Sequence, residues 1–189
     1  MTRERPLVVV VTGSECTGKT TLALSLADRF GEPCSPEFAR EYLDRKDAPL
    51  VAGDVEPIAR GQVAGEDVAL AGASGVVIKD TDLVSTVVYA QHYYGACPPW
   101  IERAAEARLG DLYLLLHPDV PWVEDGLQRD RPAGRAYLHG LFRQRLSSLG
   151  ARFVDIAGDW PARRAVAIRA VQSFLASRAQ TPNRGQLRR

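Results

Sequence analysis

The chain has 189 residues, of which 46% are hydrophobic and 25% are charged, as expected for a single globular domain. Its 24 Lys and Arg residues balance 23 Asp and Glu residues, which excludes a strongly basic nucleic-acid-binding protein. The cysteines, Cys16, Cys34 and Cys97, are odd in number and lack metal-ligand spacing, so we expect neither disulfides nor a zinc site. No apolar run approaches the roughly 18 residues of a membrane helix, and we expect a cytoplasmic protein away from membranes.

Strands and helices are expected to alternate along the chain. Apolar, β-branched runs predict buried strands, and apolar side chains spaced one turn apart predict amphipathic helices. The first elements expected are strand Leu7–Val11, helix Lys19–Phe30, a weak strand at Cys34–Pro36, and helices Glu37–Lys46 and Val55–Ala71. The later ones are strand Gly75–Asp80, helices Leu83–Tyr94 and Trp100–Leu109, strand Leu112–Leu116, helix Arg135–Leu149, strand Phe153–Ile156 and helix Pro161–Ala179.

This alternation predicts an α/β fold in which a parallel sheet carries helices on both faces. The domain is expected to cover residues 1–179, with residues 180–189 as a flexible tail. In such a fold the ligand crevice lies at the carboxyl ends of the strands. Thr12–Gly13, Asp80–Asp82 and His117–Pro118 all fall on that edge.

The first strand runs into the octapeptide GSECTGKT, which fits the phosphate-loop pattern G-x-x-x-x-G-K-[ST] at every defined position. Its glycines allow backbone N–H groups to turn inward around a phosphate, at the positive end of the following helix. Lys19 has the length to reach the β- and γ-phosphates, and the Thr20 hydroxyl suits one coordination site of Mg²⁺. The predicted ATP-binding residues are Gly13, Ser14, Glu15, Cys16, Thr17, Gly18, Lys19, Thr20 and Thr21.

Two acids, Asp80 and Asp82, lie at the end of the expected strand Gly75–Asp80. A phosphate-loop protein usually has there the acid that holds Mg²⁺, so we predict Asp80 as a metal residue. Asp82 lies two residues on and is a candidate for binding the substrate or for acting as the catalytic base. The alternative is that Asp80, Thr81 and Asp82 cap the helix that starts near Leu83, and both roles can coexist.

Glu37 and Arg40 follow the weak second strand and lie one helical turn apart. Glu37 could accept a proton from a hydroxyl that attacks the γ-phosphate, with Arg40 binding substrate or phosphate. The alternative is a helix-start acid that favours the helix dipole and pairs with Arg40. The spacing leaves both interpretations open.

The segment from Trp122 to Gly134 is polar, rich in arginine and interrupted by proline, so we expect a mobile loop. Arg129, Arg131 and Arg135 could close over a triphosphate as a lid and stabilise the charge of the transferring phosphoryl group. The alternative is a solvated charged loop. We favour the lid because the phosphate loop indicates phosphate chemistry independently.

The histidines and tyrosines give weaker signals. His92, His117 and His139 lie in separate elements without an acidic partner at helical spacing, so we expect structural histidines rather than metal ligands. Tyr89 and the tyrosines near it have the spacing of core residues, and a minority interpretation has one of them stacking on a flat heterocycle.

Four segments together resemble the ribosylnicotinamide kinase domain of the NadR family, which is a P-loop nucleoside kinase-like ATPase. They are Val10–Leu22, which contains the phosphate loop, Pro36–Tyr42, Asp80–Asp82 with Thr86 and Tyr89, and Trp122–Gly126. The similarity extends from Leu7 to about Phe174 and is more specific than the phosphate loop alone.

The resemblance implies a three-layer P-loop kinase with a five-stranded parallel sheet. Its activity would be transfer of the γ-phosphoryl group of ATP to the ribose 5′-hydroxyl of nicotinamide riboside, which gives nicotinamide mononucleotide. It implies Glu37, Arg40, Asp82 and Tyr89 for the nucleoside, Asp80 and Asp82 for Mg²⁺ and substrate, Arg129 and Arg131 for the lid, and Gly158 with Arg163 beside the adenine.

NadR proteins often carry an adenylyltransferase domain before the kinase, whereas only Met1 to Pro6 precedes the first strand here. We therefore expect a free-standing kinase, or a relative with another nucleoside acceptor, and a homo-oligomer remains open. A GTPase switch is disfavoured because His117-Pro-Asp-Val stands where a guanine-reading Asn-Lys-x-Asp would be needed. A regulatory module that hydrolyses ATP slowly remains the alternative of a different class.

Overall fold

The computed structural model describes residues 5–122 and 134–180, and within them five strands and seven α-helices alternate. The strands are β1 (Leu7–Gly13), β2 (Cys34–Ser35), β3 (Val76–Asp80), β4 (Leu112–Leu116) and β5 (Phe153–Ile156). The helices are α1 (Lys19–Phe30), α2 (Phe38–Lys46), α3 (Val55–Gly72), α4 (Leu83–Tyr94), α5 (Pro99–Ala107), α6 (Arg135–Ser148) and α7 (Trp160–Gln180), with a 3₁₀ turn, η1, at Ala52–Asp54.

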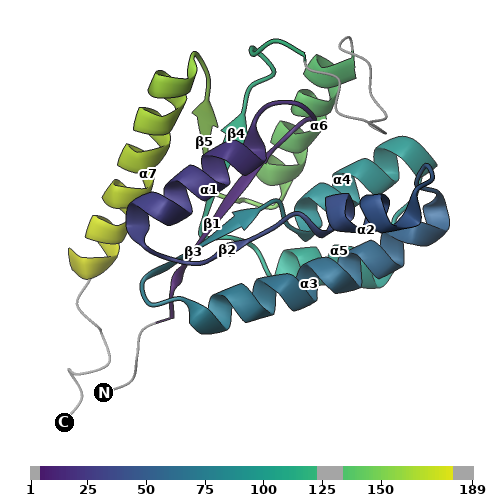
Figure 1. The fold of residues 1–189 in the computed structure, drawn as a ribbon, viewed down its shortest axis with the longest axis horizontal. Coiled ribbons are helices and arrows are strands. Elements are labelled where there is room, and N and C mark those ends of the chain that lie inside the picture. The colour runs from purple at the N-terminus through teal and green to yellow at the C-terminus, as the bar shows by residue number, and fades with distance from the viewer. Residues whose placement is uncertain (1–4, 123–133, 181–189) are drawn as a thin grey trace.

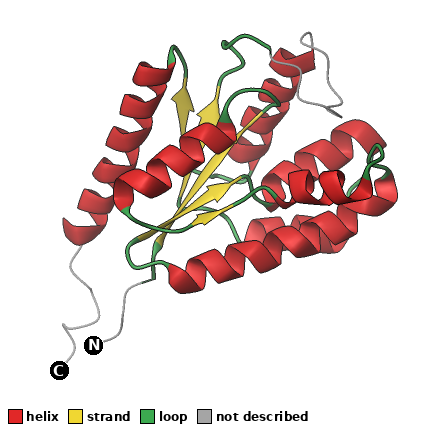
Figure 2. Ribbon diagram, in the orientation of Figure 1, coloured by secondary structure: helices red, strands yellow, loops and turns green. Residues whose placement is uncertain are grey.

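All five strands form one parallel sheet in the order β2-β3-β1-β4-β5, which confirms the predicted fold class. Helices cover both faces of this sheet (Figures 1 and 2). On one face, alternate residues of β1 such as Leu7, Val9 and Val11 pack with side chains of α1 and α7. On the other face, Val8 and Val10 pack with side chains of α3, α4, α5 and α6. The alternating side chains of one buried strand thus serve two cores.

The strand register decides which residues meet at the ligand-binding edge. In β1, Val11 pairs with Asp80 of β3, and Gly13 pairs with Leu116 of β4. The phosphate loop therefore starts between the ends of β3 and β4. This is the arrangement that the carboxyl ends of parallel strands predict for a ligand crevice.

The predicted elements are confirmed, and their bounds differ from the observed ones by two residues or fewer. Glu37, expected as the first residue of a helix, is instead the extended N-cap residue of α2. The 3₁₀ turn η1 has no counterpart in the prediction. Most of the expected lid, with Arg129 and Arg131, and residues 181–189 of the expected tail lie outside the described residues. None of the helices in the described ranges combines the length and apolarity needed to cross a bilayer.

Candidate active site

The phosphate loop between β1 and α1 depends on two glycines. Gly13 has φ 137° and Gly18 has φ 83°, backbone conformations that residues with a Cβ rarely adopt. A Cβ would lie 2.8 Å from the Leu116 carbonyl oxygen at Gly13 and 1.8 Å from the Trp160 ring at Gly18. No side chain caps the N-terminus of α1 at Gly18, so the first N–H groups of the helix can serve an anion.

Lys19 is held across this loop. Its Nζ donates a hydrogen bond of 3.1 Å to the Ser14 carbonyl oxygen, which also accepts one of 2.8 Å from the Thr17 hydroxyl. The Lys19 side chain is only 8% exposed, yet it lines the cavity described below. An ammonium in this position can meet the oxygens of a bound phosphate after a small side-chain movement.

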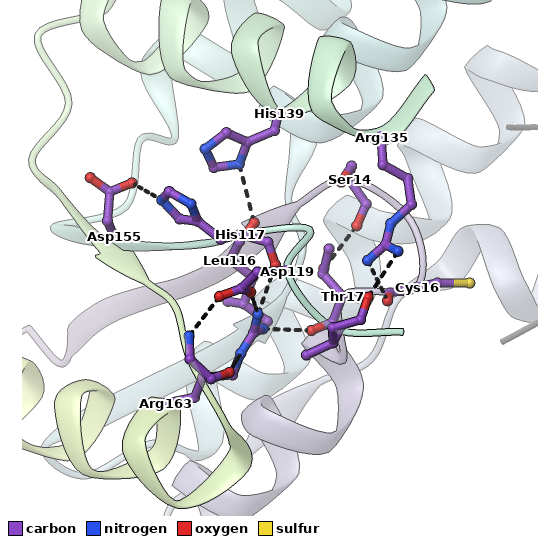
Figure 3. A network of polar contacts seen from close by, with 12 residues as sticks. Ser14, Cys16, Thr17, Leu116, His117, Asp119, Arg135, His139, Asp155 and Arg163 are labelled. Atoms are coloured by element: carbon purple, nitrogen blue, oxygen red, sulfur yellow. Dashed lines mark hydrogen bonds and ion pairs between the residues drawn. The ribbon is translucent and has the colours of Figure 1, made fainter. Parts of the chain in front are cut away.

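Two arginines from the C-terminal half of the chain donate hydrogen bonds to backbone carbonyl oxygens of the phosphate loop (Figure 3). Arg135 Nη2 donates to the Cys16 carbonyl oxygen at 3.1 Å, and Arg163 Nη1 donates to that of Thr17 at 3.0 Å. In a trans peptide the C=O and the following N–H point in opposite directions. Fixing these two carbonyls outward therefore turns the N–H groups of Thr17 and Gly18 toward the phosphate side.

Arg163 is fully buried and does not belong to the described residues that line the cavity. Besides Thr17, its guanidinium contacts the carbonyl oxygens of Gly158 and His117 and the Asp119 carboxylate. The family resemblance implied a place beside the adenine for Arg163, whereas in the structure its buried guanidinium bonds the Thr17 carbonyl oxygen of the phosphate loop. Trp160, which packs on Gly18, lines the cavity in this region instead.

One cavity of about 1220 Å³ extends from the phosphate loop to α2 and α3. Single-ligand pockets usually measure roughly 300–1,000 Å³, so this one has room for a nucleotide and a second small molecule. The predicted site residues that line it are Glu15, Cys16, Thr17, Gly18, Lys19, Thr20, Thr21, Glu37, Arg40 and Tyr89. The cavity therefore unites the predicted nucleotide end with the predicted acceptor end.

Tyrosines of α4 form part of the cavity wall next to the phosphate loop. The Tyr89 and Tyr93 rings are stacked, with centroids 6.0 Å apart and planes 4° from parallel. The Tyr93 hydroxyl donates to Glu15 at 3.1 Å, and the Tyr89 hydroxyl lies 3.5 Å from the Gly13 carbonyl oxygen. Tyr89 also packs edge-on against the core residue Phe142. Its ring thus combines the predicted core role with a place at the cavity.

Asp80, at the end of β3, has the setting of a magnesium-binding acid. It is 2% exposed, and its Oδ1 is buried without a hydrogen-bond partner among the residues that the structure describes. Burial and the charge of Glu37 raise the pKa of Asp80, against the lowering effect of a hydrogen bond from Thr20. An unpartnered carboxylate oxygen beside a threonine hydroxyl is a donor set that suits Mg²⁺. The structure thus brings together Thr20 and Asp80, the two residues predicted for the metal.

Asp82 has a different setting from Asp80. One carboxylate oxygen caps α4 by accepting from the N–H groups of Val84 and Ser85 at 3.0 and 3.4 Å. The other accepts from the Tyr113 hydroxyl at 2.7 Å. Burial, with a contribution from Glu66, raises the pKa of Asp82 to about 6. With both oxygens bonded, Asp82 fulfils the helix-capping alternative. Neither Asp80 nor Asp82 is among the residues that line the described cavity.

At the acceptor end, Glu37 and Arg40 line the cavity, and Gln62 of α3 fixes the start of their helix. Gln62 Oε1 accepts a hydrogen bond of 2.9 Å from the Phe38 N–H, which directly follows Glu37. Gln62 is 3% exposed, and its Nε2 lies 3.4 Å from Glu66. These contacts hold the Glu37 backbone at the edge of the cavity.

A second carboxylate, Asp54, also lines the cavity at the predicted acceptor end. It accepts hydrogen bonds from the Tyr42 hydroxyl at 2.9 Å, from Lys46, and from the Val51 N–H at 2.7 Å. Partial burial acts against ionisation, but these donors together lower the pKa of Asp54. The apolar residues Leu43, Leu50, Val55 and Ile58 lie around it in the cavity lining.

Sequence reasoning missed Gln62, Asp54 and Trp160. Gln62 and Glu66 lie four positions apart on the face of α3 that also carries Ala59 and Ala69, and that spacing was a signal for a buried polar pair. Asp54 precedes α3 at a position where a capping acid is common. Trp160 gave no signal, because its contact with Gly18 joins residues far apart in the chain.

The AAA domain family model matches this chain over residues 8–163. The trifunctional NAD biosynthesis/regulator proteins NadR of Escherichia coli (strain K12) and Salmonella typhimurium (strain LT2) are each 33% identical over 124 residues. Each match covers 64% of this chain but only 30% of the relative, so the chain corresponds to a minor part of either protein.

Solved structures of NadR have the same fold. The NadR protein in complex with NR has a TM-score of 0.76 at 28% identity, covering 92% of this chain and 53% of that one. NadR in complex with NAD and AMP-PNP has a TM-score of 0.75 at 27% identity, covering 92% and 51%. Thymidylate kinase from Ehrlichia chaffeensis, at 15% identity and TM-score 0.63, covers 89% and 100% and shares the fold alone. The predicted resemblance to NadR is thereby confirmed, and the chain belongs to the AAA domain family.

Proposed function

We propose that this chain is an ATP-dependent kinase that phosphorylates the ribose 5′-hydroxyl of nicotinamide riboside and yields nicotinamide mononucleotide. The observation that carries the proposal is the single cavity in which the phosphate loop faces Glu37 and Arg40. Its volume of about 1220 Å³ accommodates a donor and an acceptor at once. The similar NadR structure with NR, 28% identical, supports the choice of acceptor.

ATP is the proposed donor. The loop geometry suits a triphosphate, and the similar NadR structure with NAD and AMP-PNP supports an adenine nucleotide. The strand β4 is followed by His117-Pro-Asp-Val rather than by a guanine-reading Asn-Lys-x-Asp, so GTP should be a poor donor. Use of ATP accords with a cytoplasmic location.

Thr20 and Asp80 are the residues proposed to hold Mg²⁺. When bound there, Mg²⁺ would neutralise charge on the β- and γ-phosphates. Thr20 offers a hydroxyl, and Asp80 offers the buried Oδ1, which has no hydrogen-bond partner in the described part of the chain. Lys19 and the N–H groups of the loop supply further positive potential that the chain provides by itself.

Glu37 is the proposed group that orients the acceptor hydroxyl and accepts its proton. It lies in the cavity wall, close enough to Asp80 for its charge to raise the pKa of that residue. Asp82 is the weaker candidate, because Val84, Ser85 and Tyr113 already bond both of its carboxylate oxygens.

The other acceptor and donor contacts follow from the cavity lining and from the sequence. Arg40 and Tyr89 are proposed contacts of the nucleoside, since both line the cavity. Arg129 and Arg131 are proposed lid cations on sequence grounds alone.

Coupled measurement of ATP consumption tests the function. We expect consumption to depend on nicotinamide riboside and to fall to a low background without it. A panel of purine, pyrimidine and deoxy nucleosides measures acceptor choice by kcat/KM. Consumption that is the same with and without every nucleoside would identify a regulatory ATPase instead. A higher kcat/KM for another nucleoside would support the kinase activity but reject nicotinamide riboside as its acceptor.

A further inference from the structure

Outside the cavity, the ends of β4 and β5 and the second turn of α6 bring two histidines and an acid together (Figure 3). His117 follows β4, His139 lies in α6 and Asp155 lies in β5. Each offers one potential ligand atom, and the three atoms lie within 4.8 Å of one another. The His117 and His139 rings have centroids 4.4 Å apart. The proposed kinase function uses none of these side chains.

His139 presents a ring nitrogen in the form that a metal requires. Its Nδ1 lies 3.2 Å from the Leu116 carbonyl oxygen, which can only accept a hydrogen bond, so this nitrogen carries the proton. In the neutral ring, the lone pair is then on Nε2. This Nε2 is buried and has no hydrogen-bond partner within residues 5–122 and 134–180. A histidine whose second nitrogen donates to a backbone carbonyl is the usual arrangement of a metal-ligating imidazole.

The other two groups are held close to this nitrogen. His117 Nε2 lies 3.0 Å from Asp155 Oδ1, a carboxylate oxygen that accepts a hydrogen bond from this nitrogen, so a bound metal ion would displace that proton into solvent. The His117 backbone is fixed by a hydrogen bond of 2.8 Å from Arg163 to its carbonyl oxygen. Asp155 also pairs with Arg143, one turn after His139 in α6. The Asp155 side chain is 41% exposed and that of His117 is 33% exposed, so an ion can reach the cluster from solvent.

We propose that His117, His139 and Asp155 form a binding site for a transition-metal dication of the Zn²⁺ class, with water completing the coordination. Two imidazoles and one carboxylate suit such an ion and do not suit Mg²⁺, which prefers oxygen ligands. Metal–ligand bonds of about 2.1 Å in a tetrahedron place ligand atoms about 3.4 Å apart, so side-chain rotation on a fixed backbone closes the site. The site shares no residue with the phosphate loop or with the Thr20 and Asp80 pair, and none of its three residues is among those that line the described cavity.

Metal titration of the untagged, nucleotide-free full chain tests the site. We expect saturable binding of one Zn²⁺ by calorimetry, unaffected by excess Mg²⁺. Co²⁺ should give tetrahedral or five-coordinate d–d absorption without the charge-transfer bands of a cysteine thiolate. Absence of saturable binding would overturn the proposal, as would a cobalt spectrum dominated by thiolate bands, because the latter would locate the metal at a cysteine.

Variants assign the ligands. Asp155→Asn and His139→Gln should each weaken Zn²⁺ binding by about tenfold or more. Because the Asp155 side chain is exposed, Asp155→Asn still tests the site if His139→Gln, which replaces a buried ring nitrogen, prevents folding. His92→Gln is the matched control at a histidine outside the cluster and should leave the affinity unchanged. Arg143→Gln removes a competing cation from Asp155 and should tighten binding. Equal affinity in the wild type, Asp155→Asn and Arg143→Gln proteins would overturn the assignment.

Discussion

Arg163 donates a hydrogen bond of 3.0 Å to the carbonyl oxygen of Thr17, which joins the start of α7 to the phosphate loop across 146 positions of sequence. The same guanidinium contacts the carbonyl oxygens of Gly158 and His117 and the carboxylate of Asp119. One buried side chain therefore ties the ends of β4 and β5 to the loop. The conformation of the phosphate loop depends on this contact as well as on its own glycines.

Arg163→Lys should impair nucleotide binding without changing the cavity lining. A lysine has a single donor group and cannot reach all four acceptors in the planar geometry of a guanidinium. We expect the free energy of unfolding to fall by about 1–3 kcal/mol, the cost of leaving a buried polar group unpaired. We expect kcat/KM for ATP to fall by about tenfold to a hundredfold as the loop loses its position. Denaturant unfolding and initial-rate kinetics measure the two effects.

Arg164→Lys is the matched control for this prediction. Arg164 is the next residue of α7, and its hydrogen bond of 2.7 Å to Ser25 is exposed. Both stability and kinetics should stay close to those of the wild type. Equal kinetics in the two variants would show that Arg163 does not position the loop.

Lys19→Ala should abolish phosphoryl transfer while the domain remains folded. In the proposed reaction the lysine neutralises charge that develops on the phosphates, and in the structure its Nζ donates to the Ser14 carbonyl oxygen. Circular dichroism and thermal melting establish the fold, and turnover with ATP measures the loss. A folded variant with turnover near that of the wild type would reject the assignment of the loop.

Glu37→Gln should lower kcat by about 10²–10⁴ with little change in KM for ATP, because it keeps the shape of the side chain and removes its basicity. Asp80→Asn should instead raise the Mg²⁺ concentration needed for half-maximal rate. The measurement is turnover and nucleotide affinity of both variants across a magnesium titration.

Glu41→Gln is the matched control for Glu37→Gln. Glu41 lies one turn further along α2, pairs with Arg45 on the surface and does not belong to the described cavity lining. It should turn over like the wild type. Normal turnover of Glu37→Gln would reduce that residue to a helix-start acid and make Asp82 the better candidate for the base.

The raised pKa of Asp82 predicts that the stability difference between the wild type and Asp82→Asn depends on pH. Its pKa rises from 3.8 to about 6 on burial. A carboxyl group with a raised folded-state pKa contributes stability that is complete below its unfolded pKa and is lost as the pH rises through the folded value. Asp82→Asn lacks this titration. As the pH rises from about 4 to about 7, the wild type loses this contribution and the variant does not, so the free energy of unfolding of the variant should rise relative to that of the wild type. Thermal melts of both proteins across that range measure it.

The activity of the same variant separates the two roles of Asp82. As a helix cap bonded to Tyr113, it should be replaceable by Asn with kcat within a few fold of the wild type. A loss of about a hundredfold in kcat without a pH-dependent change in stability would identify Asp82 as the base.

The fold and the phosphate loop could be predicted because their signals are local. Apolar runs such as Leu7–Val11 mark strands, and the octapeptide between a strand and a helix specifies both its conformation and its chemistry. The position of Asp80 at the end of β3 could be predicted for the same reason, since an apolar strand precedes it and the carboxyl ends of parallel strands lie at the ligand edge. Its role in metal binding stays a prediction.

Contacts between distant segments could not be predicted. Arg163 has no local feature that indicates Thr17 as its partner. His117 and His139 are 22 positions apart in separate elements, and only the order of β4, β5 and α6 around the sheet brings them beside Asp155. Sequence spacing within single helices, which predicted structural histidines, contains no information on such a cluster.

Transfer of labelled phosphate to the nucleoside is the decisive test of the proposed kinase activity. The chain is incubated with ATP labelled at the γ-phosphate, Mg²⁺ and nicotinamide riboside, and the products are separated and identified. We expect the label on nicotinamide mononucleotide, at the ribose 5′-oxygen, in proportion to the ADP formed. Label that appears only as inorganic phosphate, at a rate that nicotinamide riboside does not change, would contradict it.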